Sequence, residues 1–153
     1  MATFYSDVAT NLLVNTPPVK AKVNRYHARL RIVEAQFTVP AGTAIGDVIV
    51  WFNMPLGARL VGHLSQLQWS AGAASSTLNL GDQASAARHL AATAVTTAGT
   101  AVPSVAQAGG ALSYETTDAS TAATNDCQLR STVAGAGLQT GQVITLRAVI
   151  ALD

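Results

Sequence analysis

Charged side chains are scarce in this sequence. Only 11% of the 153 residues are Asp, Glu, Lys or Arg, against roughly 25% in ordinary soluble domains. Hydrophobic residues make up 49%, which disfavours intrinsic disorder because disordered chains combine low hydrophobicity with high net charge. Lysine and glutamate are too rare for a coiled coil. A net charge of +1 does not provide the excess of positive charge that is typical of proteins that bind a polyanion.

Cysteine and long apolar runs are also missing. Cys127 is the single cysteine, so no intrachain disulfide can form and nothing indicates an oxidising compartment. The opening MATFYSDVATNLLV has no basic region and only a three-residue apolar run, so we do not expect a signal peptide. The uncharged stretches 60–81 and 89–114 contain many Gly, Ser and Thr residues, which excludes membrane-spanning helices of about 20 apolar residues.

Motifs that would carry catalysis or metal binding are absent from the sequence. His27, His63 and His89 do not stand at metal-ligand spacing, and there is no HExxH, Cys-x-x-Cys or Gly-x-Ser-x-Gly sequence. The closest useful carboxylate pair, Glu115 and Asp118, has no second cluster beside it, and a turn role for Asp118 is more economical. We therefore predict no enzyme activity, no catalytic residue, no cofactor and no metal ion.

The first 24 residues differ from the rest of the chain. The adjacent prolines Pro17 and Pro18 exclude a helix or a central strand and hold the chain extended. We predict an extended N-terminal arm over residues 1–24 and one β-sandwich domain over residues 25–153. The arm is either a loose terminus or a segment that docks on a neighbouring subunit. Its apolar anchors are Phe4, Tyr5, Leu12, Leu13 and Val14.

From residue 25 onward the chain alternates with the period of a β-strand. The segment 25–39 predicts a long strand with a β-bulge near Ile32 and Val33, where the apolar parity switches. The last strand is the cleanest, because the even-numbered residues from 144 to 152 are all apolar. Further strands are predicted at residues 46–52, 59–69, 77–80, 111–117, 127–133 and 142–152, with another inside 93–110.

One helix is predicted, with Asp82 as the N-cap of the alanine-rich segment 83–92. Seven or eight short strands separated by Gly, Pro and Asn turns, with one brief helix, indicate an all-β fold. We predict a single jelly-roll-like antiparallel β-sandwich.

The cationic side chains gather where the predicted arm joins the sandwich. Five of the nine lie within twelve residues, and the three arginines share one side of the first strand if no bulge intervenes. Only Tyr26 is available nearby for base stacking, so nucleic-acid binding is disfavoured. A surface for a protein partner and a merely solvated strand face both stay open. The members of this basic cluster are Lys20, Lys22, Arg25, Arg29 and Arg31.

Several short segments resemble small structural proteins of tailed bacteriophages. They are the Gly-Asp-Val-Ile strand at Gly46–Ile49, the Pro-Leu-Gly-Ala-Arg turn at Pro55–Arg59 and the STLNLGD segment at Ser76–Asp82. The opening MATFYSDVATN and the closing TGQVITLRAVIAL are also similar to that group.

The resemblance implies a capsid decoration (cement) protein, a jelly-roll-like subunit on the outside of an icosahedral phage head. Its expected partners are the major capsid protein and further copies of itself, as a dimer or trimer, with no membrane and no direct nucleic-acid contact. Its expected location is the virion exterior, after synthesis in the bacterial cytoplasm. Two alternatives stay open: a head-completion or tail structural protein, and a carbohydrate-binding β-sandwich (adhesin). Trp51, Trp69 and Tyr114 are the central aromatic residues, and all three are expected in the core or in strands.

Overall fold

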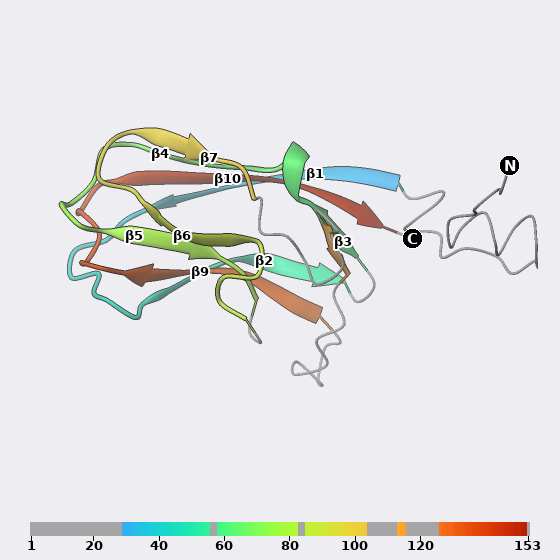
Figure 1. Cartoon of the computed structure of the whole chain (residues 1–153), viewed down its shortest axis with the longest axis horizontal. Helices are drawn as coiled ribbons and strands as arrows, with labels where there is room; N and C mark the ends of the chain where they lie inside the picture. Colours follow the sequence, from blue (N-terminus) through green and yellow to red (C-terminus); the bar gives the residue numbers. More distant parts are fainter. Residues whose placement is uncertain (1–28, 56–57, 83–84, 104–112, 116–125, 153) are drawn as a thin grey trace, which may run out of the picture.

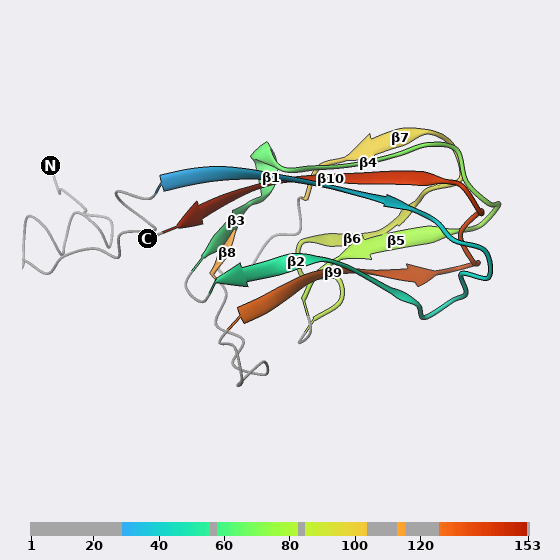
Figure 2. The same cartoon turned by 180° about the vertical axis from the view of Figure 1, so that it is seen from behind.

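The structure is a computed structural model that describes residues 29–55, 58–82, 85–103, 113–115 and 126–152. The predicted arm, residues 1–24, lies outside these residues, as do Lys20, Lys22 and Arg25 of the basic cluster. The described chain forms two antiparallel sheets that lie face to face, as the two layers in Figure 1 and Figure 2 show. The predicted all-β, jelly-roll-like sandwich is confirmed.

The first sheet has six strands and is built around the last strand of the chain. Its strands are β1 (Arg29–Thr38), β3 (Arg59–Val61), β4 (Gln66–Trp69), β7 (Gly99–Ala101), β8 (Ser113–Glu115) and β10 (Val143–Leu152). On one side β10 pairs with β1, from Arg29 opposite Leu152 to Thr38 opposite Val143. On its other side β10 pairs with β4 and β3, which in turn pair with β7 and β8.

The second sheet has four strands in the order β2-β9-β5-β6. Their bounds are Val48–Pro55 for β2, Thr77–Leu80 for β5, Leu90–Ala94 for β6 and Asp126–Ala134 for β9. The core lies between the two sheets, where alternate residues of each strand point inward. Ile144, Leu146, Ala148 and Ile150 are buried, which confirms the inward face predicted for the last strand. The opposite sheet contributes Leu78, Leu80, Leu129 and Val133 to the same core.

The bulge predicted in the first strand is wrong. β1 pairs with β10 in one register over all ten residues, whereas the register shift lies in β2, between Val50 and Phe52. The apolar parity appears to switch because Leu30 and Ile32 do not face the core. They lie on the outer face of the sheet and are 58% and 69% exposed.

The helix predicted after Asp82 is also wrong. Residues 86–89 form a turn and a bend, and β6 begins at Leu90, which pairs with Leu80 of β5. Asp82 does make a cap-like contact, since its Oδ1 accepts the backbone N–H of Ser85 at 2.7 Å. The hairpin prevails because the backbone N–H of His89 donates to the carbonyl of Leu80 at 2.9 Å. Pairing between β5 and β6 therefore overrides the helical propensity of the alanines.

The single strand predicted over residues 59–69 is interrupted by a 3-10 turn, η2 (Gly62–Leu64). β3 pairs with β10 up to Ile150 and β4 pairs with it up to Arg147, which leaves a gap at Ala148 and Val149. The hydroxyl of Ser65 closes this gap, because it accepts the backbone N–H of Val149 and donates to the carbonyl of Val61, both at 2.9 Å. In Figure 1 the turn stands as a green coil above β10.

Candidate interaction surfaces

Two residues of the predicted basic cluster lie in the described structure. Arg29 and Arg31 begin β1 and are both exposed. Because β1 has no bulge there, residues two apart point to the same side, as predicted. The other predicted interface residues, Phe4, Tyr5, Leu12, Leu13, Val14, Lys20, Lys22 and Arg25, lie outside the described residues.

An apolar surface, which we call the β1 patch, lies on the outer face of the same strand end. Ile32 stands opposite Val149, and Leu30 stands opposite Ala151, so the four side chains share one face of the sheet. η2, which contains Leu64, 50% exposed, joins β3 to β4 on the side of β10 away from β1. The sequence analysis missed this patch, although its signal was present: Leu30 and Ile32 have the parity opposite to the arginines.

The outer face becomes polar further along β10. Nη2 of Arg147 lies 2.8 Å from Oε2 of Glu34, and both side chains are more than half exposed. This ion pair bounds a depression of about 190 Å³ that Gln66, Gln68 and Thr145 complete. An exposed ion pair of this kind contributes little to stability, on the order of 0–1 kcal/mol. It does mark the edge of the β1 patch with two opposite charges.

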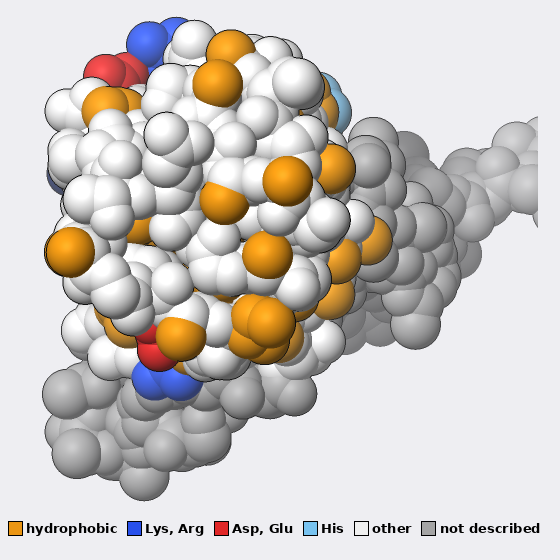
Figure 3. All heavy atoms as spheres, turned by 90° about the vertical axis from the view of Figure 1, so that its left-hand side faces the viewer, with side chains coloured by type: hydrophobic (Ala, Val, Ile, Leu, Met, Phe, Trp, Pro, Cys, Tyr) orange, Lys and Arg blue, Asp and Glu red, His pale blue; other side chains and the backbone are white. Residues whose placement is uncertain are grey.

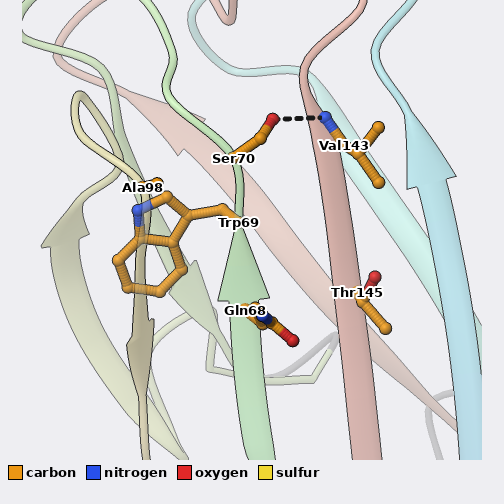
Figure 4. A pocket seen from close by; sticks show the side chains of 6 residues that line it. All are labelled: Gln68, Trp69, Ser70, Ala98, Val143 and Thr145. Atoms are coloured by element: carbon orange, nitrogen blue, oxygen red, sulfur yellow. Dashed lines mark hydrogen bonds between the residues drawn. The ribbon is translucent and has the colours of Figure 1, made fainter.

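A larger open depression, of about 350 Å³, adjoins the first. Figure 4 shows its lining, which combines the polar side chains of Gln68, Ser70 and Thr145 with Trp69, Ala98 and Val143. Trp69 is buried and its indole N–H donates to the carbonyl of Thr97 at 2.7 Å.

The aromatic side chains that the structure describes offer no exposed sugar-stacking platform. Trp69 is buried in the core, as predicted. Trp51 is half-buried in β2 and donates its indole N–H to Oγ of Ser131 at 2.9 Å. Phe37 and Phe52 are also half-buried against the core. Tyr114 lies in β8, consistent with the predicted strand.

The end of the sandwich far from Arg29 is almost free of charge. Four connections meet there, residues 39–47, 70–76, 95–98 and 135–142, and we call this surface the loop tip. Asp47 is its only charged residue, and its Oδ2 accepts the backbone N–H of Ala44 at 2.8 Å. Figure 3 looks onto this end and shows charged groups only toward the margins. The loop tip is therefore a surface with very few charged groups. Few charges would have to lose their hydration if a protein partner covered it.

Three ionisable residues lie together in the hairpin between β5 and β6. Asp82 and His89 are buried, and Arg88 forms an ion pair with the carboxylate of Asp82. Burial lowers the pKa of His89 to about 4, because desolvation outweighs the opposing effect of Asp82, and Arg88 lowers it further. This cluster therefore lies in a hairpin, where the sequence predicts a helix over residues 83–92.

The buried histidine predicts a loss of stability in acid. The pKa of His89 is about 4 in the folded chain and 6.5 as its ordinary value, so between these values only the unfolded chain takes up the proton. We expect the free energy of unfolding to fall by about 3 kcal/mol as the pH drops from 7 to 4, at 1.36 kcal/mol per pKa unit. Urea denaturation at several pH values, compared with the His89→Gln variant, measures this slope. Parallel curves for the two proteins would contradict the assignment.

In the described part of the chain, no three His, Cys, Asp or Glu side chains come together as a metal site. His63 is exposed on η2, whereas His27 lies outside the described residues. No helix in the described ranges is long and apolar enough to cross a bilayer.

The structure defines a class of protein, the jelly-roll-like β-sandwiches. Its distinctive features are on the surface: the β1 patch, the exposed Arg29 and Arg31, and the loop tip. Two solved phage capsid structures contain chains of similar fold. In the "Cyanophage Pam1 capsid asymmetric unit" the match covers 82% of this chain and 86% of that chain, with 19% identity and a TM-score of 0.60. In the "Capsid of Ralstonia phage GP4" it covers 82% and 85%, with 17% identity and a TM-score of 0.61. No protein-family model and no curated protein matches the sequence.

Proposed function

We propose that this chain is a structural protein of a phage virion that binds the outside of an icosahedral head and stabilises it. The observation that carries the proposal is the fold shared with chains of two phage capsids over four fifths of this chain. The segments that resemble phage structural proteins lie in and between strands of the sandwich. Gly46–Ile49 leads into β2, Ser76–Asp82 contains β5, and the Pro55–Arg59 segment joins β2 to β3.

The surfaces of the sandwich suit a protein that functions in contact with other proteins. A loop tip with one charged residue in four connections loses little hydration energy when a partner covers it. Small side chains such as Ala, Gly and Ser also lose little conformational entropy in an interface. Many identical copies on a symmetric shell would multiply such weak contacts.

A reconstitution experiment tests the proposed role. Purified full-length protein is added to heads that lack it, and the heads are re-isolated on a density gradient. We expect saturable binding at a fixed ratio to the major capsid protein, together with a higher temperature of DNA release. Absence of binding to heads, or binding only to tails, would contradict the proposal and favour a tail role.

The N-terminal arm and the basic cluster are the proposed contact elements. Arg29 and Arg31 lie exposed at the first residues of β1, directly after the segment that carries Lys20, Lys22 and Arg25. Clustered positive charge at an interface guides association with an acidic partner surface and makes binding depend on salt. We propose that this cluster faces the capsid shell or a neighbouring subunit.

Neutralising one arginine of the cluster is expected to weaken head binding without affecting the fold. We expect Arg31→Gln to reduce the affinity for heads about 3- to 10-fold at low salt, equivalent to on the order of 1 kcal/mol, and to reduce the salt dependence. The matched control is Arg147→Gln, an exposed arginine of the same sheet outside the cluster. Binding isotherms at two salt concentrations measure both. Equal effects of the two substitutions would remove the special role of the cluster.

A further inference from the structure

The exposed part of the β1 patch consists of two apolar side chains of β1. Ile32 is 69% and Leu30 58% exposed, while Val149 and Ala151, opposite them on the same face, are buried. The ion pair between Glu34 and Arg147 closes the patch toward the polar part of the sheet. Exposed apolar side chains that cluster in this way are typical of interaction sites, in contrast to apolar residues scattered singly.

The segment preceding β1 has the chemistry to cover such a patch. Twenty-eight residues come before Arg29, and they carry the apolar anchors Leu12, Leu13 and Val14. These anchors are followed by Pro17 and Pro18, which favour an extended backbone. The stretch from Val14 to Arg29, when extended, spans up to about 50 Å, which exceeds the width of a domain of this size.

The positions of the N-terminal segment and of the β1 patch favour a second copy of this chain as the source of the segment that covers the patch. The segment joins the sandwich at Arg29, the residue next to Leu30 of the patch, so the point of departure and the acceptor surface lie at the same end of the molecule (Figure 2). Copies that meet at this end around a symmetry axis can each give a segment and receive one. Such an exchange closes on itself, whereas a distant acceptor would generate open chains.

We propose that the β1 patch receives the apolar anchors of the N-terminal arm from a second copy of this chain. The inference rests on the proposed function for its setting, because a decoration protein works as several copies side by side. It specifies the exposed side chains of the acceptor surface, Leu30 and Ile32. In this arrangement Arg29 and Arg31 lie on the other side of the strand and remain available to the capsid shell.

Site-specific photocrosslinking of the full-length protein tests the exchange directly. A benzoylphenylalanine placed at position 32 is irradiated in purified protein, with and without heads, and the products are separated by size and mapped by mass spectrometry. We expect a dimer-sized product joined to residues 1–18. The control places the same group at position 45, where Ile45 is 63% exposed on the loop tip, and should not label residues 1–18.

Each other result of the crosslinking would overturn the proposal. A monomer-sized product joined to residues 1–18 would mean that each arm covers its own patch. A dimer-sized product joined to β1 would mean that two patches pair with each other. The absence of any product at position 32, with or without heads, would mean that the patch stays uncovered.

An independent measurement is the oligomeric state in solution. We expect Ile32→Ser to lower the mass found by light scattering from that of an oligomer to that of a monomer, with an unchanged circular dichroism spectrum because Ile32 lies outside the core of the sandwich. Ile45→Ser, at an equally exposed apolar position, should leave the mass unchanged. An unchanged mass for Ile32→Ser would count against the exchange. If the arms are exchanged but the protein does not bind heads, this inference holds and the proposed function fails. If the protein binds heads but Ile32→Ser leaves the oligomer intact, the proposed function holds and this inference fails.

Discussion

Heads assembled with a protein lacking residues 2–18 are expected to carry almost none of it, while the truncated protein stays folded. The deletion removes the five apolar anchors and leaves every strand that the structure describes in place, the first of which is β1. Linked contacts made by many copies strengthen binding by roughly 100- to 10,000-fold, so loss of the arm should lower occupancy at least tenfold. Occupancy is measured by quantitative mass spectrometry of gradient-purified heads, and folding by circular dichroism.

The matched control for this deletion keeps the length of the arm. Residues 2–18 are replaced by a Gly/Ser sequence of equal length, which retains the reach of the segment and removes its apolar side chains. We expect this variant to lose occupancy as the deletion does. Normal occupancy of both variants would exclude the arm as the binding element and would leave the loop tip or the sheet faces as the contact.

Replacing Gly135 with alanine is expected to be one of the most destabilising small substitutions in the sandwich. Gly135 has a φ of +74°, and a Cβ atom there would lie 2.1 Å from the backbone carbonyl oxygen of Ser75. The left-handed conformation costs about 1–2 kcal/mol for a residue with a Cβ atom. The overlap adds about 1–3 kcal/mol. We expect the free energy of unfolding to fall by about 3 kcal/mol, measured by urea denaturation.

Gly42 supplies a control with nearly the same backbone. Its φ is +82°, but a Cβ atom there would meet nothing within 4 Å. Gly42→Ala should therefore cost only the conformational part, about 1–2 kcal/mol. A similar cost for the two substitutions would show that the connections do not press against each other at Ser75. A larger cost at Gly135 would support a loop tip whose turns are locked by close backbone contacts.

A rigid loop tip has a consequence for assembly. The 135–142 connection approaches the 39–47 connection as well, since a Cβ atom at Gly137 would lie 2.3 Å from the carbonyl oxygen of Thr43. Gln142 joins two further connections, because its Nε2 donates to the carbonyls of Ser70 and Val95 at 2.9 and 3.0 Å. A surface fixed in this way loses little conformational entropy when a partner binds it.

Much of the fold was predictable where one physical pattern dominates the segment. In β10 the apolar side chains of Ile144, Leu146, Ala148 and Ile150 recur with the period of a strand and predict one inward face, and the structure buries these residues. The helix predicted after Asp82 failed because helical propensity is local, whereas the pairing of Leu80 with Leu90 depends on the tertiary fold. Sequence periodicity cannot reveal which of these two effects is stronger.

The candidate interface was predictable only in part. The exposure of Arg29 and Arg31 follows from their charge and from the strand period. The β1 patch is not predictable in this way, because the sequence pattern predicts Leu30 and Ile32 as core residues and therefore a bulge that β1 does not have. Exposed apolar residues look like core residues in a sequence. They can be recognised only when the pairing of β1 with β10 shows that they lie on the outer face of the sheet.

Electron cryomicroscopy of the purified particle, combined with a count of copies, tests the central claim most directly. We predict density for this sandwich on the outer surface of the head, repeated at symmetry-related positions with copies in the hundreds. The β1 ends of neighbouring copies should face one another around each local axis. A dozen or fewer copies at a single vertex or on the tail, or density only inside the shell, would contradict the account.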